Sequence, residues 1–333
     1  MSKSAIGSAA AAALLAGVLV LTGCSVAGTD QSATPAKPAG SVAPAAVKIG
    51  TMATQDTLPF WVAEEKGYFS AAGIKDVEIV TFQSAIELQA AFSVGSVNAM
   101  MTDIMVAANM QASGIKVVLP TIMLGATTGQ GRFAIVSAPG QKFASMADLK
   151  GVPVGTASHT ITEYVLDKLM DEAGVGAADI KKEEVDKMPV RFQLLMSGKL
   201  KAASLPEPFV SLAVKQGAQI VPGGDDAKAK NNISQSVLCV NRAFAETGGG
   251  AATVAALLKA WDRAVTDINA NPDSFRTTLV SKARLPEPLA TSYAVSTYPM
   301  AQAPTPAQIQ PVLDWMRAKG YLKADVTPAD LLP

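Results

Sequence analysis

Short apolar runs alternate with segments that carry helix start and stop signals along this chain from Val47 onward. The run VKIGTM (Val47–Met52) leads into a segment whose Pro59 suits the first turn of a helix and whose Gly67 suits a C-terminal cap. The next apolar run is VEIVTF (Val77–Phe82). Strands that alternate with helices build βαβ units, so this order predicts an α/β fold with largely parallel sheets.

The same alternation continues along the chain and divides it into two lobes. Further apolar runs predict strands over residues 97–102, 115–124, 132–137, 151–157, 200–205 and 235–241, and the stretch from about 251 to 322 is predicted to be mostly helical. A chain of 333 residues that is 49% hydrophobic can bury two cores. We expect residues 47–131 and 237–333 to form lobe I and residues 132–236 to form lobe II.

Helix caps are predicted where strands end. Ser84 with Glu87, and Thr160 with Glu163, have the spacing of capping boxes. Asp103 follows an apolar run and is a candidate N-cap of the next helix.

The N-terminal 23 residues have the order of an export signal. Lys3 precedes an apolar run, which ends in LTGC at Leu21 to Cys24. This ending resembles the bacterial lipobox, and the resemblance implies that Cys24 is lipidated and becomes the first residue of the mature protein. An uncleaved membrane anchor is the alternative, but the run is short for a span. Residues 24–46 have the composition of a flexible tether, so we expect a protein held by lipid on the extracytoplasmic face of the cell membrane.

Composition excludes several classes of partner and chemistry. The chain has 28 basic and 28 acidic residues and no basic tract, so nucleic acid is not an expected partner. His159 is the only histidine, which leaves little for a histidine-based metal site or a Ser-His-Asp triad. Cys239, in the apolar SVLCV, reads as a buried thiol. No metal or other cofactor is expected, and the sequence lacks a Walker A segment.

Several segments occur in a family's order and spacing: PFWVAEEKGYF, ELQAAFSVGSVNAM, MTDIMVAANMQASGIKVV and LMSGKLKAASLPEPFVSLAVKQGAQIV. The chain after the tether resembles the substrate-binding proteins of ABC importers for nitrate, sulfonate, taurine and thiamine precursors. Asn98 and Lys201 depart from the acidic residues that the family often has there. The resemblance implies a type II periplasmic-binding fold, two α/β lobes joined by two crossover strands. It also implies a ligand in the cleft, a monomer, and a permease with a separate ATPase subunit as partners.

Ligand contacts are expected where strands run into helix N-termini, because exposed N–H groups there suit an anionic head group. The candidates are Thr54, Gln55, Asp56, Thr57, Phe60, Gln83, Ser84, Thr102, Asp103, Arg132, Ser158, His159, Thr160, Met188 and Glu207. Capping alone would also explain Ser84 and Asp103. Arg132 could pair with a carboxylate or sulfonate or form a surface ion pair, and His159 could be a solvated loop residue. Glu207 would suit an amino group or simply favour the helix dipole.

Three functions follow from these patterns. The first is capture of a small polar organic anion of the sulfonate, taurine or nitrate type for an ABC permease. The second is binding of a thiamine pyrimidine precursor, for which Phe60 and Trp61 would have to supply the aromatic contacts. The third is an exported enzyme on the same fold, for which no paired carboxylates or activated nucleophile are evident. In the first two, Thr57 and Phe60 are expected to face the cleft, and Val62 and Ala63 the sheet.

Overall fold

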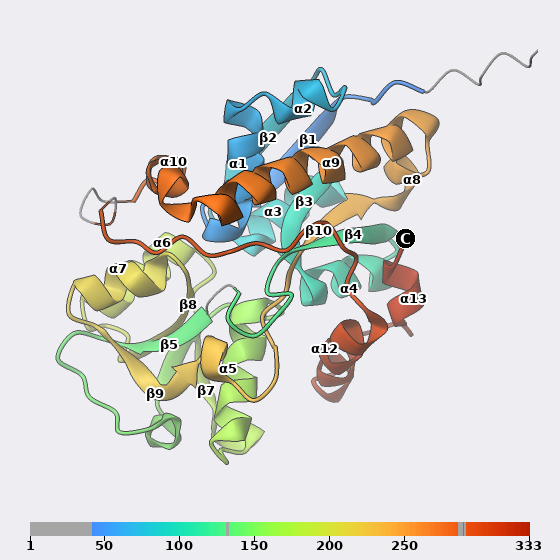
Figure 1. The fold of residues 1–333 in the computed structure, drawn as a ribbon. Helices are drawn as coiled ribbons and strands as arrows, with labels where there is room; N and C mark the ends of the chain where they lie inside the picture. Colours follow the sequence, from blue (N-terminus) through green and yellow to red (C-terminus); the bar gives the residue numbers. More distant parts are fainter. Residues whose placement is uncertain (1–41, 131–132, 286–288, 290) are drawn as a thin grey trace, which may run out of the picture. The chain divides into compact units, whose positions relative to one another are not determined.

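The computed structural model describes residues 42–130, 133–285, 289 and 291–333, and two five-stranded sheets organise this part of the chain (Figure 1). The first sheet has the order β2-β1-β3-β10-β4 and the second has the order β7-β6-β8-β5-β9. The strands of the first sheet are β1 Val47–Met52, β2 Val77–Phe82, β3 Ala99–Asp103, β4 Val117–Leu124 and β10 Ser236–Asn241. The strands of the second sheet are β5 Phe133–Ser137, β6 Pro153–Thr156, β7 Lys181–Glu184, β8 Ala202–Pro206 and β9 Gln219–Asp225.

Each sheet combines parallel pairs with one antiparallel insertion. In the first sheet β1 pairs in parallel with β2 and β3, while β10 runs antiparallel between β3 and β4. In the second sheet β6 pairs in parallel with β7 and β8, while β5 runs antiparallel between β8 and β9. The chain therefore passes from the first sheet to the second before β5 and returns before β10. The predicted α/β architecture of two lobes is confirmed.

Two strands have no signal in the sequence. β7 reads KKEE and lies at an edge of its sheet, and β9 at the opposite edge contains Pro222 and two glycines. Edge strands bury little, so their residues need not be apolar, and pairing with β6 and β5 determines their conformation.

Helices follow the carboxyl ends of strands. The longer ones are α1 Leu58–Glu65, α3 Ala85–Ser93, α4 Ile104–Ala112, α5 Ile161–Glu172, α6 Met188–Met196, α7 Phe209–Lys215, α9 Gly248–Ala270, α10 Arg276–Lys282 and α12 Pro306–Ala318. The single-turn helices are α2 Tyr68–Ala71, α8 Arg242–Ala245 and α13 Pro328–Leu331. As predicted, Pro59 lies in the first turn of α1 and Gly67 takes positive φ after the end of that helix. Gly114, Gly174 and Gly198 take positive φ after the ends of α4, α5 and α6. None of the described helices has the length and apolar character needed to cross a bilayer.

The α1 helix is buried on nearly every side, which corrects the expected orientation of Phe60. Figure 1 shows the long helix α9 beside α1, and the Phe60 ring packs against Phe69 and Trp261, with ring centroids 6.0 Å and 5.2 Å away. Trp61 and Val62 belong to the same core. Because α2, α9 and α10 all contact this short helix and the Phe60 side chain is fully buried, Phe60 is a core residue rather than a cleft residue.

We predict that Phe60→Ala lowers the free energy of unfolding by about 3–5 kcal/mol, because it leaves a cavity beside Trp261. Urea denaturation followed by tryptophan fluorescence measures this change. The matched control is Val94→Ala, at an exposed position, which should change stability by less than about 0.5 kcal/mol. A Phe60→Ala protein of unaltered stability would contradict the core assignment.

Candidate functional site

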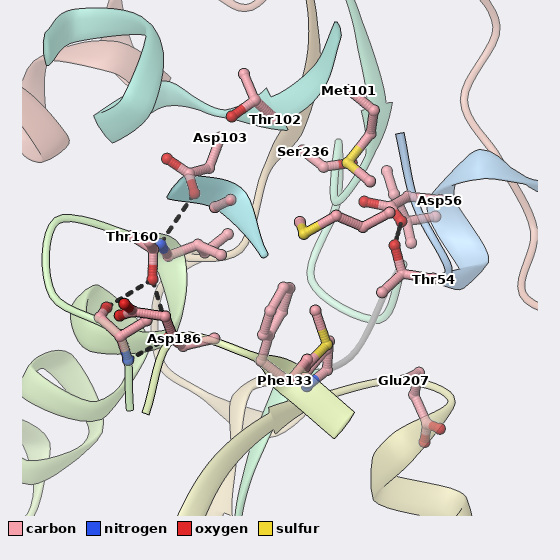
Figure 2. A pocket seen from close by; sticks show the side chains of 18 of the residues that line it. Thr54, Asp56, Met101, Thr102, Asp103, Phe133, Thr160, Asp186, Glu207 and Ser236 are labelled. Carbon is pink, nitrogen blue, oxygen red and sulfur yellow. Dashed lines mark hydrogen bonds between the residues drawn. The ribbon is translucent and has the colours of Figure 1, made fainter. Parts of the chain in front are cut away.

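A cavity lies where elements of the two lobes face each other, beyond the carboxyl ends of β1, β3, β6 and β8 (Figure 2). Its volume of about 60 Å³ is room for a small solute, since one water needs about 10–15 Å³. The lining residues that the structure describes are Met52, Thr54, Asp56, Ala85, Ile86, Met101, Thr102, Asp103, Leu124, Phe133, Ala157, Thr160, Ile161, Thr162, Asp186, Met188, Arg191, Pro206, Glu207 and Ser236. Apolar side chains with a few convergent polar groups are the usual lining of a ligand site.

Three polar side chains of the first lobe meet at one side of this cavity. Thr54 and Asp56 follow β1, and the Thr54 hydroxyl donates to Oδ1 of Asp56. Ser236 opens β10 and pairs in register with Asp103 at the end of β3, so antiparallel pairing brings it to the same sheet edge. Burial raises the pKa of the Asp56 carboxyl above its ordinary value, and the hydroxyls of Thr54 and Ser236 oppose this. Figure 2 shows Thr54, Asp56 and Ser236 on the same side of the pocket.

Asp103 joins the two lobes through its carboxylate. Its Oδ1 accepts from the N–H of Val106, 2.8 Å away, which caps α4 as predicted, and its Oδ2 accepts from the N–H of Ile161 at the start of α5, 3.0 Å away. Burial raises the pKa of Asp103 to about 6, although these backbone N–H groups oppose the rise. The carboxylate thus connects the N-termini of two helices across the cavity.

Two further contacts join the lobes near the cavity. The carbonyl of Gln83 accepts from the N–H of Met188 at 3.4 Å, and Lys187 pairs with Glu87 at 3.0 Å. The Lys187 ammonium lowers the pKa of the Glu87 carboxyl through a hydrogen bond. In each contact the first-lobe partner lies in the loop before α3 or in the first turn of α3. The second-lobe partner lies at the start of α6.

The predicted capping box at Thr160 and Glu163 does not form. The Thr160 hydroxyl donates instead to the carbonyl of Ala157, 2.7 Å away, and Oε2 of Glu163 accepts from the N–H of His159. Glu163 is also paired with Lys182 at 2.6 Å. Because the partly buried Lys182 ammonium attracts the buried Glu163 carboxylate, the Glu163 side chain does not bond to the N–H of Thr160, its N-cap residue.

The buried cation Arg191 and the carboxyl of Asp186 line the cavity from the second lobe, and Glu184 is a neighbour of both. Arg191 is 2% exposed, and its Nε and Nη1 donate to the carbonyls of Val185 and Ser204 at 2.9 Å and 3.0 Å. Burial lowers the pKa of Arg191 to about 10, and the charges of Glu184 and Asp186 oppose this. A hydrogen bond with Glu184 raises the pKa of Asp186. The sequence did not indicate this pair of carboxyls.

About half of the expected contact residues line the cavity: Thr54, Asp56, Thr102, Asp103, Thr160, Met188 and Glu207. The Glu207 carboxylate points toward α7, where it accepts from the N–H and hydroxyl of Ser211 at 3.1 Å and 2.9 Å (Figure 2). Glu207 therefore acts at the start of α7, which fits the alternative that this acid favours the helix dipole.

The other expected residues lie elsewhere. Gln55 accepts from the hydroxyl of Tyr293, 2.6 Å away, and the Thr57 hydroxyl donates to the carbonyl of Met52. Ser84 caps α3 and Gln83 is exposed. The Ser158 hydroxyl donates to Glu184, and the His159 ring stacks on Tyr321, with centroids 3.8 Å apart. Phe60 is in the core, and Arg132 and Cys24 lie outside the described residues.

The lining residues that sequence reasoning missed are mainly apolar side chains, together with Thr162, Asp186, Arg191 and Ser236. Ser236 is the first residue of the predicted return strand, so the antiparallel direction of that strand was the signal that could have found it. Within the described ranges, no three His, Cys, Asp or Glu side chains are grouped so that they could hold a metal ion.

The chain matches a known family and known folds. A model of the NMT1/THI5-like family matches residues 54–275. The alkanesulfonate-binding protein SsuA from Xanthomonas axonopodis pv. citri, bound to MOPS, has a TM-score of 0.72 at 18% identity, over 86% of this chain and 98% of that chain. The periplasmic aliphatic sulphonate-binding protein SsuA from Escherichia coli has a TM-score of 0.69 at 20% identity, over 85% and 96% of the two chains.

The periplasmic nitrate-binding protein NrtA from Synechocystis has a TM-score of 0.69 at 15% identity, over 85% of this chain and 84% of that chain. No curated protein matches the sequence. At these identities the likenesses show that the chain has the periplasmic-binding-protein fold, as the sequence predicted.

We predict that Asp103 makes the folded state less stable as pH rises from about 4 to about 6. The folded protein holds the Asp103 proton up to a pKa of about 6 against an ordinary value of 3.8, so the group favours the folded state most in acid. This contribution amounts to about 3 kcal/mol. It is lost as pH rises across that window, and above the window Asp103 causes no further change in stability.

Urea unfolding of the original protein and of Asp103→Asn at several pH values tests this. The stability of the original protein relative to Asp103→Asn should fall as pH rises through the window. Asp314→Asn, whose side chain is 61% exposed, is the matched control and should follow the original profile. A difference between the original protein and Asp103→Asn that stays flat or grows with pH would rule out the raised pKa.

Proposed function

This chain belongs to the NMT1/THI5-like family, and from that premise we propose that it is the extracytoplasmic solute-binding protein of an ABC importer. The observation that carries the proposal is a small cavity lined by residues of both lobes. A hydrogen bond from the N–H of Ile161 to Asp103 joins the two lobes at this cavity. Solutes bind in such folds at the carboxyl ends of strands, and relative movement of two lobes can capture and release them. The proteins of similar structure include binding proteins for alkanesulfonate and nitrate.

In this proposal the solute enters between the lobes and is delivered to a membrane permease whose ATPase is a separate subunit. Asp103, Gln83 and Glu87 contact the second lobe beside the cavity, so these contacts form when the lobes come together. A permease can then distinguish the loaded protein by the relative position of its lobes. The protein would work as a monomer held at the membrane by lipid on Cys24.

Two ligand classes follow from the sequence. The binding proteins of similar structure favour a small organic anion of the sulfonate, taurine or nitrate type. Arg191 is the basic side chain among the described lining, and its Nε and Nη1 already donate to backbone carbonyls. A thiamine pyrimidine precursor has less support, because Phe60 and Trp61 are both buried in the core, and Phe133 is the aromatic residue among the described lining.

We predict that gently purified protein carries one small molecule per chain, which native mass spectrometry detects and denaturation releases. A carrier returns this molecule with its mass unchanged after long incubation. The exported-enzyme alternative, for which the Glu184–Asp186 pair would be the acid and base, predicts a changed mass. Ligand-dependent stimulation of ATP hydrolysis by the permease in proteoliposomes is the second readout, and loaded protein that leaves ATP hydrolysis unchanged would contradict delivery.

We also predict that Cys24→Ala prevents lipid attachment, because the thioether to diacylglycerol forms at that thiol. Globomycin-sensitive processing and incorporation of labelled palmitate should both be lost, and the protein should move from the membrane fraction to the soluble fraction. Ser25→Ala is the matched control and should remain membrane-bound. Continued membrane retention of Cys24→Ala would favour an uncleaved anchor.

A further inference from the structure

The charges that face the cavity are predominantly negative in the described part of the chain. Asp56 and Asp103 line it from the first lobe and Asp186 lines it from the second, whereas Arg191 is the basic residue among the described lining. The Arg191 guanidinium is already committed to two backbone carbonyls. It also lies in the field of Glu184 and Asp186, which compensates its charge. Among the described lining residues, an anion entering this cavity would therefore meet more acidic than basic side chains.

Asp56 is the carboxylate least compensated by the protein. It is 7% exposed, and the hydroxyl of Thr54 is its hydrogen-bond donor. No described Lys or Arg forms an ion pair with it, and desolvation is the largest influence on its pKa. A buried carboxylate without a counter-ion is unfavourable unless a cation or further donors reach it.

Ser236 gives an independent indication of a missing donor. The residue is 4% exposed and lines the cavity, and among the described residues its Oγ has no well-formed hydrogen bond. Its hydroxyl lies close enough to Asp56 to lower the pKa of that carboxyl, without meeting the geometry of a full bond. A buried hydroxyl left in this state costs free energy that a ligand donor would recover.

Across the cavity, Asp186 also has a polar atom without a hydrogen-bond partner among the described residues. Its Oδ1 is buried and has no hydrogen-bond partner among the described residues, while Glu184 holds the carboxyl by a hydrogen bond. Asp56 and Asp186 come from different lobes, and Figure 2 shows them on opposite sides of the pocket. A hydroxyl of the first lobe and a carboxyl oxygen of the second, both without a hydrogen-bond partner among the described residues, therefore lie at the cavity.

The sign of the ligand charge decides whether these groups help or oppose binding. Two unit charges a few ångström apart interact more strongly in a buried site than in water, because the effective dielectric constant is lower there. For a cation this interaction with Asp56 is attractive, and for a sulfonate it is repulsive. An ammonium or amidinium group also brings several N–H donors, which Ser236 and Asp186 lack among the described residues.

We propose that the ligand of this cavity is a small organic cation whose protonated nitrogen binds the Asp56 carboxylate and the Ser236 hydroxyl. The proposal rests on the solute-binding function and changes its ligand class from anion to cation. Asp56 is then the residue that sets specificity by charge, and Asp186 is the second acceptor, available to a second donor of the ligand.

The experiment uses the mature protein freed of ligand by denaturation and refolding, with matched probes that share a skeleton: propylammonium against propane-1-sulfonate, and acetamidinium against acetate. Calorimetry and thermal unfolding measure binding. The two cations should bind and raise the Tm. Asp56→Asn, which keeps the shape and removes the charge, should weaken their binding about 10- to 100-fold, and Ser236→Ala should weaken it less. Circular dichroism confirms that each variant is folded.

One control variant tests whether the effect is specific to Asp56. Asp314→Asn removes an exposed carboxylate on α12 and should leave cation binding unchanged. Cation binding that survives Asp56→Asn intact would overturn the assignment of Asp56.

The remaining outcomes distinguish the cation proposal from the solute-binding function. If the sulfonate or acetate binds and the cations do not, the ligand is an anion, and the cation proposal fails while the solute-binding function stands. If native mass spectrometry finds no ligand on the purified protein and no probe of either charge binds, both proposals fail.

Discussion

The placement of β10 between β3 and β4 is the constraint on which the rest of this structure depends. β10 comes from a distant part of the chain and runs antiparallel to both neighbours, so its first residue, Ser236, pairs with the last residue of β3, Asp103. Closing so long a loop costs entropy, which the ladder and its buried apolar side chains offset. Because this pairing returns the chain to the first sheet, it also requires that all of β5 to β9 form a separate lobe.

The cavity follows from that arrangement. Strand carboxyl ends of both lobes point at it, and the helices that follow bring N–H groups to its edge. Asp103 satisfies two of these N–H groups, one on each lobe, and is therefore part of the scaffold as much as of the site. Asp56, at the adjacent strand end, caps no comparable helix of the second lobe and remains turned to the cavity. Two acids in similar sequence positions thus have different roles.

The two sides of the cavity differ in how the charges of their acidic side chains are compensated. On the second lobe, Arg191 offsets the charges of Glu184 and Asp186, and backbone carbonyls accept from its Nε and Nη1. On the first lobe, the described groups that hydrogen-bond to Asp56 are neutral: the hydroxyls of Thr54 and Ser236 and a backbone N–H. The fold is shared with binding proteins for sulfonate and nitrate. Fold does not determine ligand, because a few side chains at the cavity set the sign of its charge.

The sequence by itself determined the α/β class, the positions of most strands, the helix ends at glycines and the cap at Asp103, because these depend on local periodicity and backbone chemistry. It also placed Thr54, Asp56 and Thr160 at strand ends, where the cavity lies. Only the tertiary structure decided that Phe60 packs on Trp261, that Glu163 pairs with Lys182, and that Ser236 and Arg191 reach the cavity. Glu163 and Lys182, Phe60 and Trp261, and the residues that Ser236 and Arg191 meet at the cavity are distant in the chain. No local pattern encodes which side of the apolar part of α1 meets α9 or which charge finds a buried partner.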